Sequence, residues 1–318
     1  MDRLPLAVFV ALALMQPTVD AAIITDGNYV QMQLELIAGN GSAGYSASMN
    51  SANSSVDSGS TSVVNGAYSA NGRAMSTLTG GPLLKARSAS TAPAASGFFT
   101  PSSLTTARAS WRDVLIPDVA GAPASVNLNF SVHARLAVSQ TVASGISGTP
   151  NLSRADIRVE AENSILGFLN AANGLDAVVR NRDGAATETL AEDNSGFINW
   201  ITTGFTALGA NEYDFDGSFT YASPLLSFSD PSAPFGAYFI GVVLRASTET
   251  LGGTASSDAF NTLTLDSITL PGGGGLPTGI NFAFESGAAL ATVPLPSSCL
   301  LLLSALLAGF TTRRLRFR

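Results

Sequence analysis

The side chains with the greatest capacity for chemistry are few in this chain. His133 is the only histidine, and it stands two positions before Arg135 on the polar side of an alternating segment. A serine-histidine-aspartate triad would have to use His133, but no Gly-x-Ser-x-Gly turn accompanies it. Metal sites built on histidine need more than one of them. We therefore expect His133 to be an exposed strand residue and the chain not to be an enzyme.

Carboxylates are the second group with chemical potential. Residues 212–217 begin like a calcium loop, with Asp214 and Asp216, but its twelfth position would be Ser223, where calcium loops carry a bidentate glutamate. Asp183 belongs to a second acidic patch. We expect these residues to face solvent, with calcium at Asp214, Asp216 or Asp183 as the alternative and no other cofactor. A secreted hydrolase would need two carboxylates about 5 to 9.5 Å apart in a cleft, which spacing along the chain does not show.

Aromatic residues could bind sugars by stacking. The candidates are Trp111, Trp200, Tyr213 and Tyr221. Tryptophan in a β-sandwich is more often part of the core, because its large apolar surface favours burial. A carbohydrate-binding module therefore stands as the alternative to a purely structural role for these four residues.

The segments that carry these residues have the two-residue period of β-strands. Residues 124–138 are the clearest case, because seven apolar residues alternate there with polar ones. Residues 164–172 fit either a strand or one helical turn. Further strands are expected at residues 29–36, 107–116, 157–161, 197–208, 211–221, 235–248 and 258–270, with Phe282 and Phe284 on one face of a last short strand.

Turn and linker signals divide these strands. Residues 42–76 are rich in Ser, Ala, Asn and Gly, which fits weak surface strands with long turns or a flexible loop. Turns or loops are also expected at residues 80–82, 91–93, 181–184, 224–234, 250–257 and 271–275. About ten to twelve strands without a long helix predict an all-β fold, an antiparallel, jelly-roll-like β-sandwich.

Charge is distributed unevenly along the 318 residues. The whole chain has a net charge of −7, but residues 22–292 hold eleven cations and twenty-one carboxylates, which gives −10 for that part. An acidic body argues against nucleic-acid binding, which needs a basic face. The single cysteine, Cys299, lies outside residues 22–292, so these residues cannot form a disulfide with one another.

The N-terminus has the pattern of a secretory signal peptide. Arg3 is followed by an apolar stretch at residues 4–15, and Val19-Asp20-Ala21 fits a small-x-small cleavage site. We expect a signal helix in residues 1–21 with the cut between Ala21 and Ala22 or one residue later. An uncleaved anchor is the alternative. The exported body is then residues 22–292, with weaker strands in 22–104 and the main core in 105–292.

The C-terminus has three parts in a fixed order. Val293-Pro294-Leu295-Pro296 is held extended by its prolines. An apolar run at residues 299–310 follows, and residues 293–312 would span roughly 30 Å as a transmembrane helix. The last part is a group of arginines without carboxylates, which predicts a cytoplasmic end and a body on the other side of the membrane. These arginines are Arg313, Arg314, Arg316 and Arg318.

This order of box, apolar span and arginines resembles the PEP-CTERM sorting signal of Gram-negative bacteria, with Leu295 in place of the commoner glutamate. Residues 258–271 and 284–287 also resemble the segment that precedes this signal in many such proteins. The resemblance implies recognition by an exosortase-type membrane transpeptidase, after delivery by the export machinery. It implies anchoring in the inner membrane before processing, then a place at the cell surface or in an exopolysaccharide matrix. A plain tail anchor is the alternative reading of residues 293–318.

Overall fold

A computed structural model describes residues 30–49, 55–57, 61–78, 81–94, 102–140, 152–161, 173–182, 185–192, 198–227 and 231–288. Within these ranges the chain forms sixteen strands and no helix, and every strand pairing is antiparallel. The all-β, antiparallel, sandwich-like fold is therefore confirmed. The same ranges contain no helix long and apolar enough to cross a membrane.

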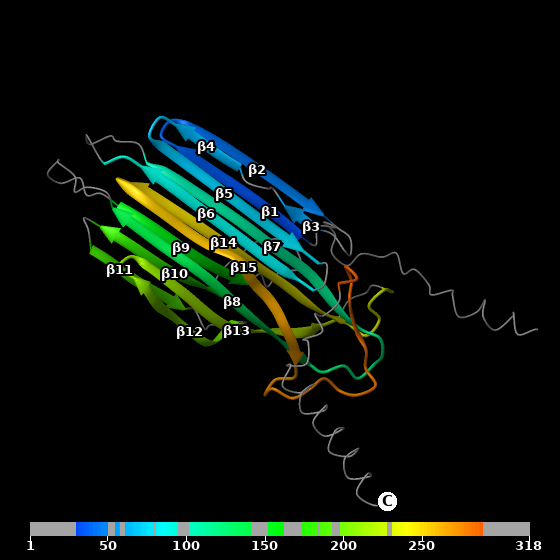
Figure 1. Cartoon of the computed structure of the whole chain (residues 1–318). Helices are drawn as coiled ribbons and strands as arrows, with labels where there is room; N and C mark the ends of the chain where they lie inside the picture. Colours follow the sequence, from blue (N-terminus) through cyan, green and yellow to red (C-terminus); the bar gives the residue numbers. More distant parts are fainter. Residues whose placement is uncertain are drawn as a thin grey trace, which may run out of the picture.

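One layer, called layer A, has the strand order β2-β1-β7-β14-β9-β10-β11, with β16 beside β7. Its strands are β1 (Val30–Ala38), β2 (Gly41–Met49), β7 (Ser103–Pro117), β9 (Leu152–Ala161), β10 (Asn173–Arg182), β11 (Ala185–Glu192), β14 (Ala237–Leu251) and β16 (Phe282–Phe284). In Figure 1 the strands of this layer lie roughly parallel to one diagonal of the view. Their colours change from blue at β1 and β2 to green at β10 and β11.

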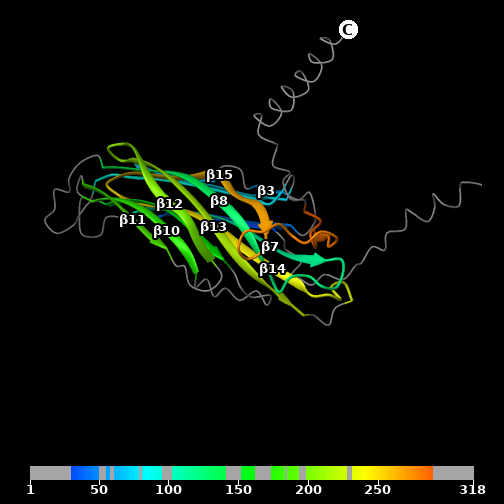
Figure 2. The same cartoon turned by 90° about the horizontal axis from the view of Figure 1, so that it is seen from below.

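The other layer, called layer B, has the order β5-β6-β15-β8-β13-β12, with β3 and β4 on β5. Its strands are β3 (Ser55–Asp57), β4 (Thr61–Asn65), β5 (Tyr68–Thr77), β6 (Leu83–Ala92), β8 (Ser125–Gln140), β12 (Ile198–Gly209), β13 (Glu212–Leu226) and β15 (Gly253–Thr269). Strand pairing joins the two layers, within the described residues, where Leu225 and Leu226 of β13 pair with Tyr238 and Ala237 of β14. Figure 2 shows the arrangement from a direction at right angles to the first.

A single hydrophobic core lies between the layers. On β8 the seven alternating residues from Val126 to Val138 are all buried, as their period predicted. A row of rings crosses the core from layer A to layer B, because Trp111 contacts Phe130, Phe130 stacks on Phe219, and Phe219 contacts Trp200. Each such pair contributes roughly 0.5–1.5 kcal/mol beyond its buried area. Residues of β5 and β6 belong to the same core cluster as those of β7 to β16.

Small hydroxyl residues hold the layers together where large apolar residues are scarce. Thr105 on β7 donates to the carbonyl of Ala89 on β6 at 2.9 Å, and Ser257 on β15 donates to that of Asp156 on β9 at 2.8 Å. Ser153 Oγ on β9 likewise donates to the Ser139 carbonyl at 2.9 Å. Short side chains allow the sheets to approach closely, and the hydrogen bonds satisfy polar groups that burial removes from water.

These hydroxyl residues explain where the predicted elements differ from the observed ones. Residues 250–257 were expected to be a turn, but β14 runs to Leu251, β15 begins at Gly253, and only Gly252 lies between them, with φ 88°. Thr250 and Ser257 are buried there although they are polar. The expected linker around residues 91–93 overlaps the end of β6, and the expected loop at 224–234 overlaps β13.

The number of strands was also underestimated. Strands β6, β10 and β11 were not expected, and the described residues form sixteen strands where about ten to twelve were predicted. Weak strands, the favoured interpretation of residues 42–76, are confirmed at β2, β3, β4 and β5. The segment 164–172 lies outside the described residues. The missed strands contain few large apolar residues, so their alternation is weak in the sequence.

Candidate functional site

Several candidate residues predicted from the sequence, His133 among them, lie on the outer face of layer B. His133 Nδ1 on β8 lies 2.7 Å from Asp216 Oδ1 on β13, and Arg135 Nε donates to Glu212 Oε1 at 2.7 Å. His133 is an exposed strand residue, as predicted, with 44% of its side chain accessible. The hydrogen bond to Glu212 is the main reason that the pKa of Arg135 is raised. Exposed pairs of this kind are screened by water and contribute little to stability.

Charges alternate in register across this face. Arg87 on β6 is opposite Asp258 on β15, which is opposite Arg135 on β8, which is opposite Asp214 on β13. Arg87 Nε and Asp258 Oδ2 are 3.4 Å apart. Asp258 and Asp214 therefore each lie beside an arginine.

The two described calcium candidates, Asp214 and Asp216, both lie on this open strand face, where Asp216 contacts His133 and Asp214 is paired with Arg135. Among the described residues no group of three or more His, Cys, Asp or Glu could hold a metal ion. The third candidate, Asp183, lies outside the described residues. Because Asp214 and Asp216 lie on a strand, they do not form the loop that the calcium alternative requires.

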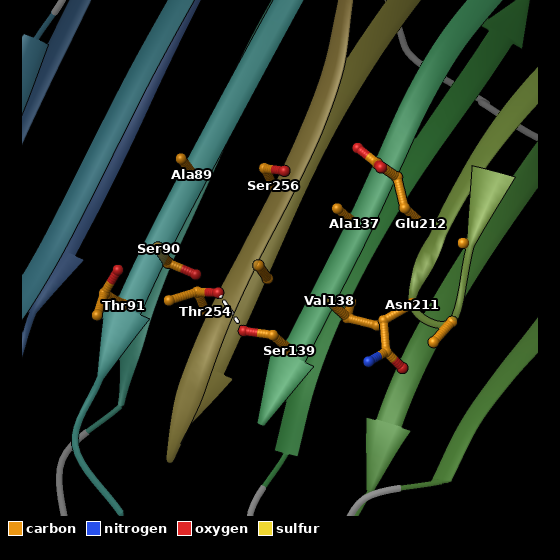
Figure 3. Close-up of a pocket in the computed structure, with 13 residues that line it drawn as sticks. Ala89, Ser90, Thr91, Ala137, Val138, Ser139, Asn211, Glu212, Thr254 and Ser256 are labelled. Atoms are coloured by element: carbon orange, nitrogen blue, oxygen red, sulfur yellow. Dashed lines mark hydrogen bonds between the residues drawn. The ribbon is translucent and has the colours of Figure 1, made fainter. Parts of the chain in front are cut away.

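A groove of about 540 Å³ is hollowed in the same face, near the end of β6, β8 and β15 and the turn that joins β12 to β13 (Figure 3). Its floor consists of small side chains such as Ala89, Ala137 and Ser256. Thr254 and Ser139 are joined across it by a hydrogen bond of 2.6 Å. Of its described lining residues only Glu212 is ionisable, and Glu212 accepts the bond from Arg135. The described lining offers hydroxyl groups, and none of these residues is an activated nucleophile.

Three of the four aromatic candidates for sugar stacking are core residues. Trp111, Trp200 and Tyr221 expose 1%, 7% and 2% of their surface, so their rings cannot present a face to a ligand. Tyr213 is half-buried and meets Phe205 edge to face at 6.2 Å. The core interpretation is thus confirmed for Trp111, Trp200 and Tyr221, and sugar stacking by these three is excluded.

A buried carboxylate that the sequence did not single out forms the most unusual local arrangement. Asp113 on β7 has no exposed surface and accepts hydrogen bonds from the Val114 backbone at 2.8 Å and from Trp111 Nε1 at 3.3 Å. Ser286 donates twice, from its backbone N–H at 3.2 Å and from its hydroxyl. Burial raises the pKa of Asp113 to about 7, and the hydrogen bonds, that of the Ser286 hydroxyl first, offset part of the rise.

The partners of Asp113 connect two distant parts of the chain. Phe284 on β16 packs edge to face against Trp111 at 5.6 Å, and Glu285 donates its backbone N–H to the Val114 carbonyl. We call Trp111, Asp113, Phe284 and Ser286 the Asp113 clasp. It fixes the last described residues, which end at Ala288, five positions before Val293.

The sequence contained a partial signal for the clasp. Phe284 and Ser286 belong to the segment that carries the resemblance, and Trp111 lies in a predicted strand, but Asp113 is not among the predicted site residues. Asp113 stands two residues after Trp111, so on a strand both point into the same layer of the core. A lone acid on the inward face of an apolar strand is the pattern that could have identified it.

The residues of the two predicted processing signals lie outside the described residues, and so does Cys299. They are Ala21 and Ala22 at the N-terminal cut, Val293, Pro294, Leu295 and Pro296 in the box, and Arg313, Arg314, Arg316 and Arg318 at the end. In comparisons with known proteins, no protein-family model matches the chain and no curated protein matches it.

Proposed function

We propose that this chain is an exported cell-surface or matrix protein whose C-terminal tail is read by an exosortase-type transpeptidase. The observation that carries the proposal is the order of signals in one chain. A signal-peptide pattern stands at residues 1–21, and the Val293–Pro296 box, the apolar run and the terminal arginines follow at the other end. Export machinery, the inner membrane and the transpeptidase are the partners that this order requires.

The body has properties that suit such a location. Residues 22–292 contain no cysteine, so folding there does not depend on disulfide formation in the compartment. The Asp113 clasp holds residues up to Ala288 against the body, and a cut near the box would leave the clasp intact. We also assign the body to jelly-roll-like sandwiches, because the consecutive strands β13, β14 and β15 alternate between the layers.

The test compares three full-length chains in a cell that makes an exosortase-type transpeptidase and in one that lacks it. They are the natural chain, the box variant Pro294→Ala/Pro296→Ala, and the matched control Pro271→Ala/Pro277→Ala in the body. Fractionation and the intact mass of the mature protein are the measurements. We expect the natural chain and the control to lose the tail only where the enzyme is present. The box variant should keep the tail and stay with the membrane.

Two outcomes would contradict the proposal. One is the same mature mass for the natural chain and the box variant, which would show that the box is not read. The other is a tail that persists in every mature product, which would identify residues 293–318 as a plain anchor. A mature protein whose intact mass still includes residues 1–21 would separately contradict cleavage after Ala21.

A further inference from the structure

The arginines of the body are concentrated on one surface. Residues 22–292 contain ten arginines, and seven of them fall on the outer-facing positions of β7, β9, β10 and β14 in layer A. We call this surface the arginine face. Its members are Arg108, Arg112, Arg154, Arg158, Arg180, Arg182 and Arg245. A body with a net charge of −10 therefore presents a cation-rich face.

Strand register places like charges side by side there. Arg108 on β7 is directly opposite Arg245 on β14, which is directly opposite Arg158 on β9. Directly opposite like charges destabilise a sheet. Layer B has one such pair, Arg73 opposite Arg87, whereas its third arginine, Arg135, lies between the acids Asp258 and Asp214. Glu160 offsets part of this repulsion, because its Oε1 lies 2.8 Å from Arg158 Nε, and an anion bound on this face would relieve more of it.

A groove of about 540 Å³ lies at the β10 side of this face, and we call it the arginine groove. Arg154 on β9 is directly opposite Arg180 on β10, and Arg182 follows Arg180 on the same side of that strand. Arg180 and Arg182 are exposed, and no ion pair joins either to another described residue. The described lining consists of Leu152, Arg154, Arg180, Arg182, Thr187 and Glu249.

Arg154 of the groove lies beside a buried carboxylate. Arg154 Nε lies 3.2 Å from Asp156 Oδ2, and Asp156 is only 6% exposed. Burial raises the pKa of Asp156 to about 6, while Arg154 opposes that rise. Arg154 is therefore held in place by its neighbour on β9, whereas Arg180 and Arg182 extend into solvent.

The lining chemistry favours one class of occupant. Guanidinium groups pair with carboxylates through two parallel hydrogen bonds, so three arginines suit a chain with repeated carboxylates. Glu249 and Thr187 suit hydroxyl groups on the same chain. Nucleic acid fits poorly, because none of the described lining residues is aromatic and bases would have no ring to stack on.

We propose that the arginine groove binds a carboxylated polysaccharide, with Arg154, Arg180 and Arg182 holding carboxylates and Glu249 accepting hydroxyl hydrogen bonds. This proposal rests on the proposed function, since only an exported body meets such a polymer. It also differs from stacking on aromatic rings, because its recognition is ionic and salt weakens it.

The test measures binding of polygalacturonate to the purified full-length chain in an uncharged detergent. The groove variant is Arg180→Gln/Arg182→Gln, which removes two exposed side chains. The matched control is Arg87→Gln/Arg135→Gln, which removes the same charge from layer B. The terminal arginines are present in all three chains, so their contribution cancels. We expect the groove variant to lose roughly tenfold or more in affinity and the control to lose less than about twofold.

Two other probes decide the chemistry of the ligand. Carboxyl-reduced polygalacturonate should bind far more weakly than the native polymer, and single-stranded DNA should not bind better than the native polymer. The proposal is overturned by no binding to polygalacturonate, by equal losses in the groove variant and its control, or by equal binding of the reduced polymer. Because the purified chain is used, these results do not depend on whether the tail is processed in cells.

Discussion

At the scale of single residues, Asp113 is the group whose environment departs furthest from water. Four donors surround a carboxylate that has no exposed surface. Burial outweighs these donors, so the pKa lies at about 7 instead of 3.8. The clasp therefore contains a group that is close to half-protonated at neutral pH.

This raised pKa predicts a pH dependence of stability. The folded state holds the Asp113 proton more tightly than the unfolded state does, so the free energy of unfolding should fall as the pH rises from about 4 to about 7. The slope approaches about 1.4 kcal/mol per pH unit for one such group. In Asp113→Asn this component of the slope should be missing. Urea unfolding of the full-length chain at a series of pH values measures it.

Asp118 provides the control for this prediction. Hydrogen bonds from Asn281 lower its pKa, so its contribution to stability is present above pH 4 and is lost only as the pH falls further. Asp118→Asn should therefore leave the slope between pH 4 and pH 7 unchanged. An identical slope in the natural chain and in Asp113→Asn would show that Asp113 is not the titrating group.

At the scale of the elements, the two layers are in contact near the start of β15 through small residues instead of large apolar side chains. Ser153 on β9 donates to the Ser139 carbonyl of β8, and Gly253 of β15 lies against both. A Cβ at Gly253 would come 2.1 Å from the Ser139 oxygen and 2.6 Å from the Ser153 hydroxyl. The polar contact between layers therefore depends on a residue without a side chain.

Gly253→Ala should accordingly destabilise the body by roughly 1–3 kcal/mol, because the strands must separate to admit a methyl group. Gly204→Ala on β12 is the matched control, since a Cβ there meets nothing within 4 Å and the change reduces only the freedom of the unfolded chain. The urea midpoints of the two variants measure the difference. Equal midpoints would mean that this end of the sandwich relaxes freely.

At the scale of the whole molecule, positive charge is concentrated in two places. The last six residues hold four arginines beside a body of net charge −10, and within the body the arginines gather on layer A. The terminal arginines set the predicted orientation in the membrane, since cationic residues resist transfer across it. The arginine face of layer A gives an acidic protein a surface that suits anions.

Replacing Arg313, Arg314, Arg316 and Arg318 with Gln should remove the barrier that keeps the tail on the cytoplasmic side. A C-terminal epitope should then become accessible to protease added to spheroplasts. The box variant Pro294→Ala/Pro296→Ala retains these arginines, so its epitope should stay protected. Protection of the epitope in both variants would show that the arginines do not set the orientation.

The sequence by itself determined the all-β class, the strand of β8 and the hypothesis for the tail. These conclusions rest on local patterns, since alternation and charge at a chain end are visible within about twenty residues. Strand β6 was missed because residues 88–92 are only serine, threonine and alanine and give no strong hydrophobic signal, although the fold buries Ser88, Ser90 and Ala92.

Only the tertiary structure decided the Asp113 clasp and the arginine groove. Asp113 and Ser286 are 173 positions apart, and Arg108, Arg158 and Arg245 meet because β7, β9 and β14 are neighbours in one layer. Pairing between distant strands sets which side chains stand opposite one another, and a shift of one residue would turn each to the other face. Local patterns in the sequence do not contain that register.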